Sequence, residues 1–310
     1  MAWLAGAAGL GTLILGVTLL ARVMSGRARG LSRLTGGSWP AATLAGVLAA
    51  LALQSSSLTV VLLASAVDGG SLDGPAGWAA VAGVNVGATL LPHVWTWEMP
   101  WWCPVGLGVA GVAALAPRRL RRLGLGLVGL ALVLGGFRLL EGAMGGRLAQ
   151  ELLGAGTVAA WSTWMAFGAG ILVTALLVPS QVAVGVAQSL LAAHALPPRL
   201  AVGWVSGLNI GTTADVLAAS LALGWRGRGT ALFHLGFNLV VAGMGLAAAA
   251  PLAAALRWGP PAQALARLHT GLNLGGALLV GPLVHPLWKG WLGLNPAPPA
   301  AGGPGRARRR

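Results

Sequence analysis

Long apolar stretches recur along almost the whole chain, from Trp3 to Trp288. A helix needs roughly 20 apolar residues to cross the hydrocarbon core of a bilayer. Seven stretches approach or reach that length: 3–23, 76–97, 105–117 (short, counted only with its Trp-rich lead-in), 123–142, 200–225, 230–250 and 268–288. With 56% hydrophobic and 8% charged residues, the chain is predicted to be an all-α polytopic membrane protein.

The net charge of +14 would favour a nucleic-acid partner in a soluble domain, but here the arginines fall between the apolar stretches. They therefore indicate topology, and no nucleic-acid partner is expected. Arginine clusters follow the stretches 3–23, 105–117 and 200–225 and end the chain, and such clusters stay in the cytoplasm. This predicts a multi-pass protein of the cytoplasmic membrane with its N-terminus outside and its C-terminus cytoplasmic.

Two familiar features of secreted or metal-binding chains are not expected. No basic segment precedes the first apolar stretch, so a cleaved signal peptide is not predicted. A single cysteine, Cys103, excludes a disulfide within the chain and a cysteine-based metal cluster.

A polar tetrad, Gln54, Ser55, Ser56 and Ser57, interrupts an apolar run. Unsatisfied polar groups are costly in hydrocarbon, so such a cluster belongs in a protein interior or a cavity. Isolated serines and glycines usually serve helix packing, but packing does not need glutamine. About ten apolar residues follow before Asp68, which suits a half-depth helix. We therefore expect a re-entrant hairpin whose tip, at a helix N-terminus, binds an anion.

The chain contains an internal repeat. GVNVGAT at 83–89 recurs as GLNIGTT at 207–213, displaced by 124 positions, and the same displacement places the tetrad over Val178, Pro179, Ser180 and Gln181. If 43–67 and 163–193 are hairpins, the arginine clusters all fall inside and the hairpins enter from opposite sides. Inverted repeats with interrupted helices indicate a secondary transporter, and a channel or an intramembrane enzyme are the alternatives.

The expected organisation follows from this repeat. We predict a single transmembrane transport domain over 1–294, with repeat 1 at about 39–142, repeat 2 at about 160–250, a last span at 268–288, and a disordered basic tail at 295–310. Each repeat carries one re-entrant hairpin and one interrupted helix.

Polar side chains near these interruptions supply the candidate chemistry. Asn85 and Asn209 are expected to unwind their helices and to offer amide donors and acceptors. Hydroxyl oxygens are ligands that suit Na⁺, and we place a sodium site at Ser56, Ser57 and Thr213. The expected substrate and ion-binding residues are Gln54, Ser55, Ser56, Ser57, Asn85, Thr89, Ser180, Gln181, Asn209, Thr212 and Thr213.

Asp215 is an acid inside an apolar stretch, which makes it a candidate coupling residue that ligates a cation or carries a proton. The alternative is that Asp215 is solvated at a helix end or pairs with Arg226 or Arg228.

Two histidines each precede an asparagine by four residues: His234 with Asn238, and His269 with Asn273. The spacing puts both members of each pair on one helix face. Hydrogen bonds between helices are the favoured explanation, and a shared role in a site is the alternative.

Together the tetrad, the two GxNxGxT segments and the two HxxxN segments resemble the type II sodium-dependent phosphate cotransporter family in its bacterial short form, over roughly 39–286. The resemblance implies that two hairpin tips meet to bind phosphate and sodium, and that access alternates by an elevator or rocking motion. It assigns binding to the tetrad, with Asn85, Asn209, Thr212 and Thr213 beside it. The second tip departs from the family pattern, since Pro179 has no N–H to donate.

The sequence therefore predicts a Na⁺-coupled symporter of inorganic phosphate or a similar oxyanion, not an enzyme, with no cofactor besides Na⁺ as coupling ion. Its expected partners are the lipid bilayer, a small inorganic anion and Na⁺, and a homo-oligomer is left open. Two alternatives remain: a proton-coupled carrier of another solute that uses Asp215, and a non-transporting scaffold or regulatory membrane protein that kept the fold.

Overall fold

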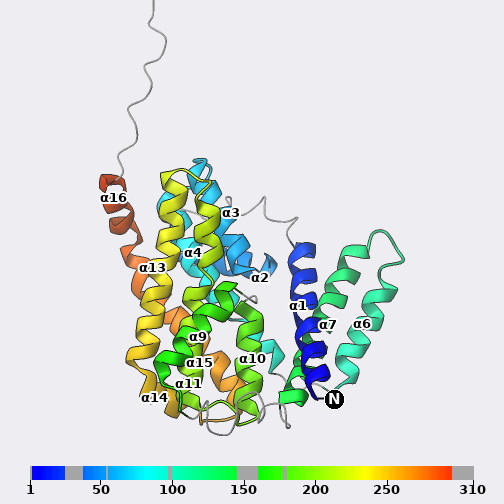
Figure 1. Ribbon diagram of the computed structural model, residues 1–310. Helices are drawn as coiled ribbons and strands as arrows, with labels where there is room; N and C mark the ends of the chain where they lie inside the picture. Colours follow the sequence, from blue (N-terminus) through cyan, green and yellow to red (C-terminus); the bar gives the residue numbers. More distant parts are fainter. Residues whose placement is uncertain are drawn as a thin grey trace, which may run out of the picture.

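The computed structural model describes residues 2–24, 38–53, 55–96, 100–144, 160–176 and 180–294, and every regular element in them is helical. The helices of the first half are α1 (Ala2–Met24), α2 (Trp39–Leu53), α3 (Ser56–Asp68), α4 (Gly74–Ala88), α5 (Leu91–Trp95), α6 (Trp102–Ala113) and α7 (Arg121–Met144). Those of the second half are α9 (Thr163–Leu176), α10 (Ser180–Ala192), α11 (Pro198–Gly211), α12 (Ala214–Ser220), α13 (Trp225–Ala247), α14 (Ala249–Ala255), α15 (Pro261–Val280), the 3₁₀ helix η2 (Gly281–Leu283) and α16 (Val284–Leu294). Figure 1 shows their arrangement, with α1, α6 and α7 grouped at one side. The all-helical fold agrees with the predicted class.

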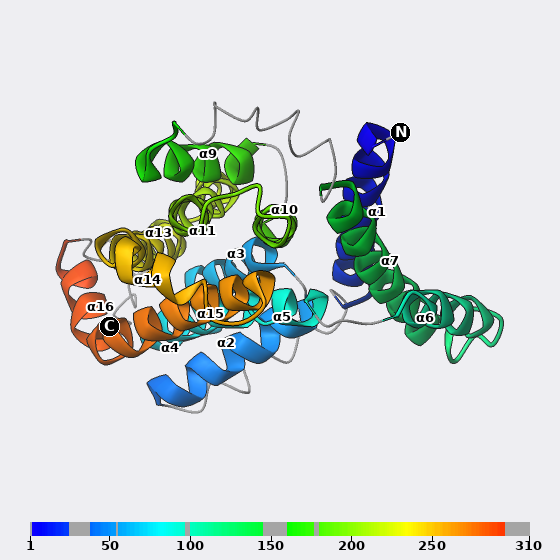
Figure 2. The ribbon, with the colours of Figure 1, turned by 90° about the horizontal axis from the view of Figure 1, so that it is seen from below.

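The helix packing shows the same internal repeat as the sequence. We call α2, α3 and α4 the first unit and α9, α10 and α11 the second unit. Helix α2 lies along α4, and α9 lies along α11 in the same way (Figure 2). Both pairs approach closely at a glycine: a Cβ on Gly83 would strike the carbonyl of Thr43, and a Cβ on Gly207 would strike the carbonyl of Phe167. Both contacts are related by the displacement of 124. The orientation of the two units across a membrane stays a prediction.

The helices that follow the two polar interruptions are short. Each of α3 and α10 has 13 residues, which at 1.5 Å per residue makes roughly 20 Å. That is less than the roughly 30 Å of a bilayer core. The length is compatible with a half-depth helix, and re-entry itself stays a prediction.

The helix breaks do not fall where the sequence predicted them. Asn85 and Asn209 lie inside α4 and α11, and the turns come later, after Ala88 and Gly211. Asn85 does not unwind its helix because its amide bonds to the Val81 carbonyl one turn back, at 2.9 Å. The breaks occur instead where threonine hydroxyls bond to carbonyls three residues back: Thr89 to Val86, Thr212 to Asn209 and Thr213 to Ile210, each at 2.7 Å.

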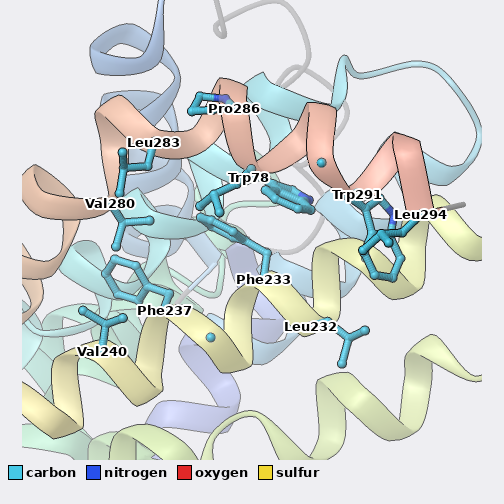
Figure 3. Close-up of a pocket in the computed structure, with 14 residues that line it drawn as sticks. Trp78, Leu232, Phe233, Phe237, Val240, Val280, Leu283, Pro286, Trp291 and Leu294 are labelled. Atoms are coloured by element: carbon cyan, nitrogen blue, oxygen red, sulfur yellow. The ribbon is translucent and has the colours of Figure 1, made fainter.

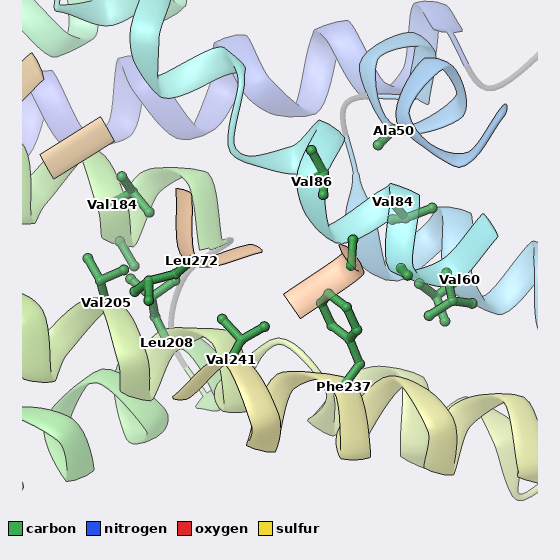
Figure 4. Close-up of a cluster of buried hydrophobic side chains, with 14 of the residues drawn as sticks. Ala50, Val60, Val84, Val86, Val184, Val205, Leu208, Phe237, Val241 and Leu272 are labelled. Carbon is green, nitrogen blue, oxygen red and sulfur yellow. The ribbon is translucent and has the colours of Figure 1, made fainter. Parts of the chain in front are cut away.

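The buried core lies between the two units. Figure 4 shows Phe237 and Val241 of α13 between Val60, which follows the first interruption, and Leu208 of the second repeated motif; Leu272 of α15 lies beside Leu208. Packing on both sides makes α13 and α15 the central elements that hold the units in register.

The start of α13 is fixed by Asp68, the last residue of α3. Its carboxylate accepts hydrogen bonds from the backbone N–H groups of Gly224, at 2.8 Å, and Gly227, at 3.1 Å. These N–H groups have no acceptor within their own helix. The carboxylate thus caps α13 and ties it to α3.

Within the described residues, one helix is long and apolar enough to cross a membrane by length and composition, namely α13 with 23 residues. Several other expected spans are not single helices. The stretch 76–97 is divided between α4 and α5, 200–225 between α11 and α12, and 268–288 among α15, η2 and α16. The stretch 105–117 overlaps the 12-residue α6, which begins at Trp102 in the Trp-rich lead-in and ends at Ala113. The predicted tail, 295–310, lies outside the described residues.

Candidate functional site

The first polar interruption forms the N-terminus of α3. Ser55 is the N-cap, and its hydroxyl oxygen accepts a hydrogen bond from the Leu58 N–H at 3.2 Å. The Thr59 hydroxyl donates to the Ser55 carbonyl at 2.6 Å. Serine favours this position because its side chain satisfies one of the N–H groups that a helix start leaves unpaired. Gln54 lies outside the described residues.

The second interruption is followed by α10, which begins at Ser180. The Ser180 hydroxyl donates to the Gln181 side-chain oxygen at 3.3 Å, and Gln181 is buried. Residues 177–179, which include Val178 and Pro179, lie outside the described residues.

The two helix starts share a small polar pocket. Ser56 and Ser180, one from each interruption, both line it. Its other polar lining residues are Asn85, Thr89, Gln181, Asn209, Thr212 and His269. The structure therefore brings together most of the side chains that the sequence singled out, from α3, α4, α10, α11 and α15. Their role in binding stays a prediction.

A larger cavity of about 340 Å³ also lies between the two interruptions. Ser55, Ser56 and Ser57 line it, together with Ser180, Gln181, Thr212 and Asp215. The Ser57 hydroxyl donates to the Thr212 carbonyl at 3.4 Å, which links the first interruption directly to the motif of the second unit.

Asp215 is exposed and stands in the first turn of α12, where its carboxylate accepts from the Val216 N–H at 2.8 Å. An ion pair between Asp215 and Arg228 was the alternative. The Arg228 guanidinium instead donates to the carbonyls of Leu221 and Leu223, each at 2.9 Å. Asp215 thus sits at the edge of the cavity with its charge turned toward a helix start.

The predicted sodium ligands are only partly assembled. Ser56 and Ser57 line the larger cavity, whereas Thr213 lines neither this cavity nor the small pocket. Thr213 is buried, and its hydroxyl donates to the Ile210 carbonyl. In the described part of the chain, no group of three or more His, Cys, Asp or Glu side chains could hold a metal ion.

The asparagine amides are oriented by histidines from the central helices. His234 Nε2 lies 3.3 Å from Asn85 Oδ1, and His269 Nε2 lies 3.0 Å from Asn209 Oδ1. An amide oxygen only accepts, so each ring donates from Nε2. These bonds confirm that the histidines join helices. Asn238 and Asn273 do not, because each donates to the carbonyl of its own histidine one turn back, at 2.9 and 3.0 Å.

The two amides differ in what remains of their hydrogen-bonding capacity. Asn85 Nδ2 donates within α4 to Val81. Asn209 Nδ2 is buried and has no hydrogen-bond partner among the described residues. A buried donor without an acceptor costs about 1–3 kcal/mol. Since Asn209 lines the small pocket, it offers a ready donor to a ligand that accepts hydrogen bonds.

The histidines are the site residues that the sequence did not assign. His269 lines the pocket itself, and His234 reaches it through Asn85. The sequence pattern that singled out the histidines was their spacing of four residues from Asn238 and Asn273. Each histidine instead contacts an asparagine on another helix, which for His234 is 149 residues away.

Comparison with known proteins agrees with the resemblance over the first half. A model of the Na⁺/Pi-cotransporter family matches residues 10–142, which is less than half of the chain and includes the first unit only. An uncharacterized protein, YqeW of Bacillus subtilis (strain 168), is 28% identical over 247 residues, covering 75% of this chain and 77% of its own length. No solved structure gives a significant match.

Proposed function

We propose that this protein is a secondary active transporter that couples Na⁺ to the movement of inorganic phosphate or a similar oxyanion across the cytoplasmic membrane. Alternating access would expose the pocket between the two interruptions to one side at a time. The similarity of residues 10–142 to the Na⁺/Pi-cotransporter family supports transport rather than catalysis.

One observation carries the proposal. Ser56 and Ser180, at the N-termini of two 13-residue helices, line one polar pocket together with Asn209, whose Nδ2 has no partner among the described residues. Helix N-termini direct unpaired N–H groups and a partial positive charge at a ligand, which favours anions. The polar linings as described contain no Lys or Arg, so recognition rests on these dipoles and on neutral donors.

Coupling to Na⁺ is supported by the oxygen atoms at the same place. The hydroxyls of Ser56 and Ser57 line the larger cavity beside the Thr212 carbonyl, and hard oxygen ligands suit Na⁺. In this proposal the anion and the cation occupy neighbouring positions, so each lowers the electrostatic cost of binding the other.

Proton coupling is the second candidate, because the Asp215 carboxylate lines the same cavity. In that case Asp215→Asn abolishes the pH dependence of uptake. An unchanged pH profile removes Asp215 from the coupling mechanism.

A binding measurement tests the proposal. In purified protein, phosphate together with Na⁺ raises the melting temperature in a saturable manner, since a ligand that binds only the folded state stabilises it. Ser56→Ala weakens this stabilisation, whereas Ser65→Ala does not. Ser65 is a matched control on the same helix, exposed and bonded to the Val61 carbonyl at 2.8 Å, away from both cavities. A folded protein that phosphate and Na⁺ do not stabilise points instead to a scaffold or regulatory protein.

A further inference from the structure

An apolar groove of about 650 Å³ lies between α13 and α16. It shares no lining residue with the polar pocket or the polar cavity. Figure 3 shows Phe233 and Phe237 of α13 on the side of that helix toward Leu283 and Trp291 of the C-terminal segment; Leu232 also lines the groove. The volume falls in the range of sites that take small molecules, roughly 300–1,000 Å³.

Aromatic packing makes the floor of the groove rigid. Trp78 stacks on Phe233 with ring centroids 4.6 Å apart, and Trp288 meets Trp78 edge-on at 5.1 Å. The rim is different, because the side chains of Leu232 and Leu287 remain 46% and 47% exposed. The groove is therefore preformed, and its apolar rim is uncovered by the rest of the described chain.

A basic residue stands at one end of the groove, in the first turn of α13. Arg226 is exposed and lies one turn before Gly229, which closes the groove against Trp291. Lys289, midway along α16, is exposed but does not line the groove. The nearby acid, Asp68, already accepts two backbone N–H groups. The uncovered apolar groove thus has an exposed cation, Arg226, at its end.

We propose that this groove binds an anionic phospholipid, with an acyl chain between α13 and α16 and the phosphate of the headgroup at Arg226. Basic sites between membrane helices on the cytoplasmic side recognise such headgroups. The arginine clusters of the sequence place this end of α13 on that side. The inference rests on the membrane location in the proposed function, and it does not depend on phosphate transport.

Glycines in the lining allow a clean test. A Cβ added at Gly236 or Gly290 meets no atom within 4 Å, so Gly236→Leu with Gly290→Leu fills the groove without straining the helices. The matched control is Gly243→Leu with Gly293→Leu, one position in each of the same two helices, equally open and outside the groove. The measurement is phospholipid retained per protein after detergent purification from vesicles of equal phosphatidylglycerol and phosphatidylcholine.

The wild type and the control retain phosphatidylglycerol in preference to phosphatidylcholine. The groove-filled variant retains roughly tenfold less phosphatidylglycerol per protein than the control. Arg226→Gln keeps lipid in the groove but loses the preference for phosphatidylglycerol. Equal retention by the filled and control variants overturns the proposal, and so does the absence of a preference in the wild type. A change from dimer to monomer on filling, with lipid retention unchanged, would assign the groove to a second copy of the chain.

Lipid retention is measured without any transport substrate. A protein that binds this lipid but fails to bind phosphate contradicts only the proposed function. A protein that binds phosphate but no lipid contradicts only the groove assignment.

Discussion

His234 Nε2 donates to Asn85 Oδ1 across 3.3 Å, from the central helix α13 to the helix of the first repeated motif. His269 makes the same contact with Asn209 in the second motif, at 3.0 Å. Each histidine fixes the oxygen of an amide and so decides where its NH₂ group points. The two NH₂ groups differ: that of Asn85 donates to the Val81 carbonyl in its own helix, whereas that of Asn209 has no acceptor among the described residues.

This inequality predicts different costs for the same substitution at the two positions. Asn209→Asp keeps the acceptor for His269 but replaces the unpartnered donor with a carboxylate oxygen, so phosphate affinity falls by at least roughly tenfold, or about 1.4 kcal/mol. Asn85→Asp, the matched control, has a smaller effect because the Asn85 donor is already used by Val81. Calorimetric titration with phosphate in the presence of Na⁺ measures both. Equal losses would mean that Asn209 has no special role.

The orienting role of His269 is tested by two replacements of different chemistry. His269→Leu leaves the buried Asn209 oxygen without a donor, which costs about 1–3 kcal/mol, and phosphate affinity falls together with stability. His269→Gln retains an N–H donor and recovers part of the phosphate affinity. If leucine and glutamine variants of equal melting temperature bind phosphate equally well, His269 is merely structural.

The repeat is the part of the fold that the sequence predicted best. The sequence predicts that the two GxNxGxT segments are copies, and their glycines Gly83 and Gly207 make equivalent close approaches to the carbonyls of Thr43 and Phe167. The position of the helix breaks was predicted wrongly, because an asparagine can bond within its helix as Asn85 does with Val81. Residue type alone does not distinguish that bond from an unwound turn.

The close approach at Gly207 predicts a clear effect on stability. Gly207→Ala places a methyl group against the Phe167 carbonyl, and such overpacking destabilises by about 1–3 kcal/mol. Gly168→Ala in the partner helix α9 is the control, since its Cβ would meet nothing within 4 Å. Denaturation followed by circular dichroism compares the two variants. A Gly207→Ala protein as stable as Gly168→Ala contradicts the packing of α9 on α11.

The cap provided by Asp68 gives a further comparison between two acids. Asp68→Ala removes the acceptor for the N–H groups of Gly224 and Gly227, which costs about 1 kcal/mol. Asp73 also occupies an N-cap position, before α4, but makes no side-chain cap hydrogen bond. Asp73→Ala therefore has little effect on the melting temperature. The account of the cap fails if the two substitutions are equally costly.

The residues that line the pocket could be predicted from the sequence better than the hydrogen bonds between them. Serines in an apolar run and a repeated GxNxGxT motif pointed to Ser56, Ser180, Asn85 and Asn209, all of which line one pocket. The histidine contacts were not predictable, since spacing along one helix gives the face a residue shares but not its partner on another helix. Thr213 is the predicted sodium ligand that lines neither the pocket nor the larger cavity, and its hydroxyl donates to the Ile210 carbonyl; its role in a sodium site stays a prediction.

Uptake of labelled phosphate into proteoliposomes under an inward Na⁺ gradient tests the central claim most directly. The account predicts saturable uptake that disappears when Na⁺ is replaced by K⁺, is strongly reduced in Ser56→Ala, and is preserved in the Ser65→Ala control. Folded protein that shows no Na⁺-dependent uptake, or uptake that Ser56→Ala leaves unchanged, would contradict it.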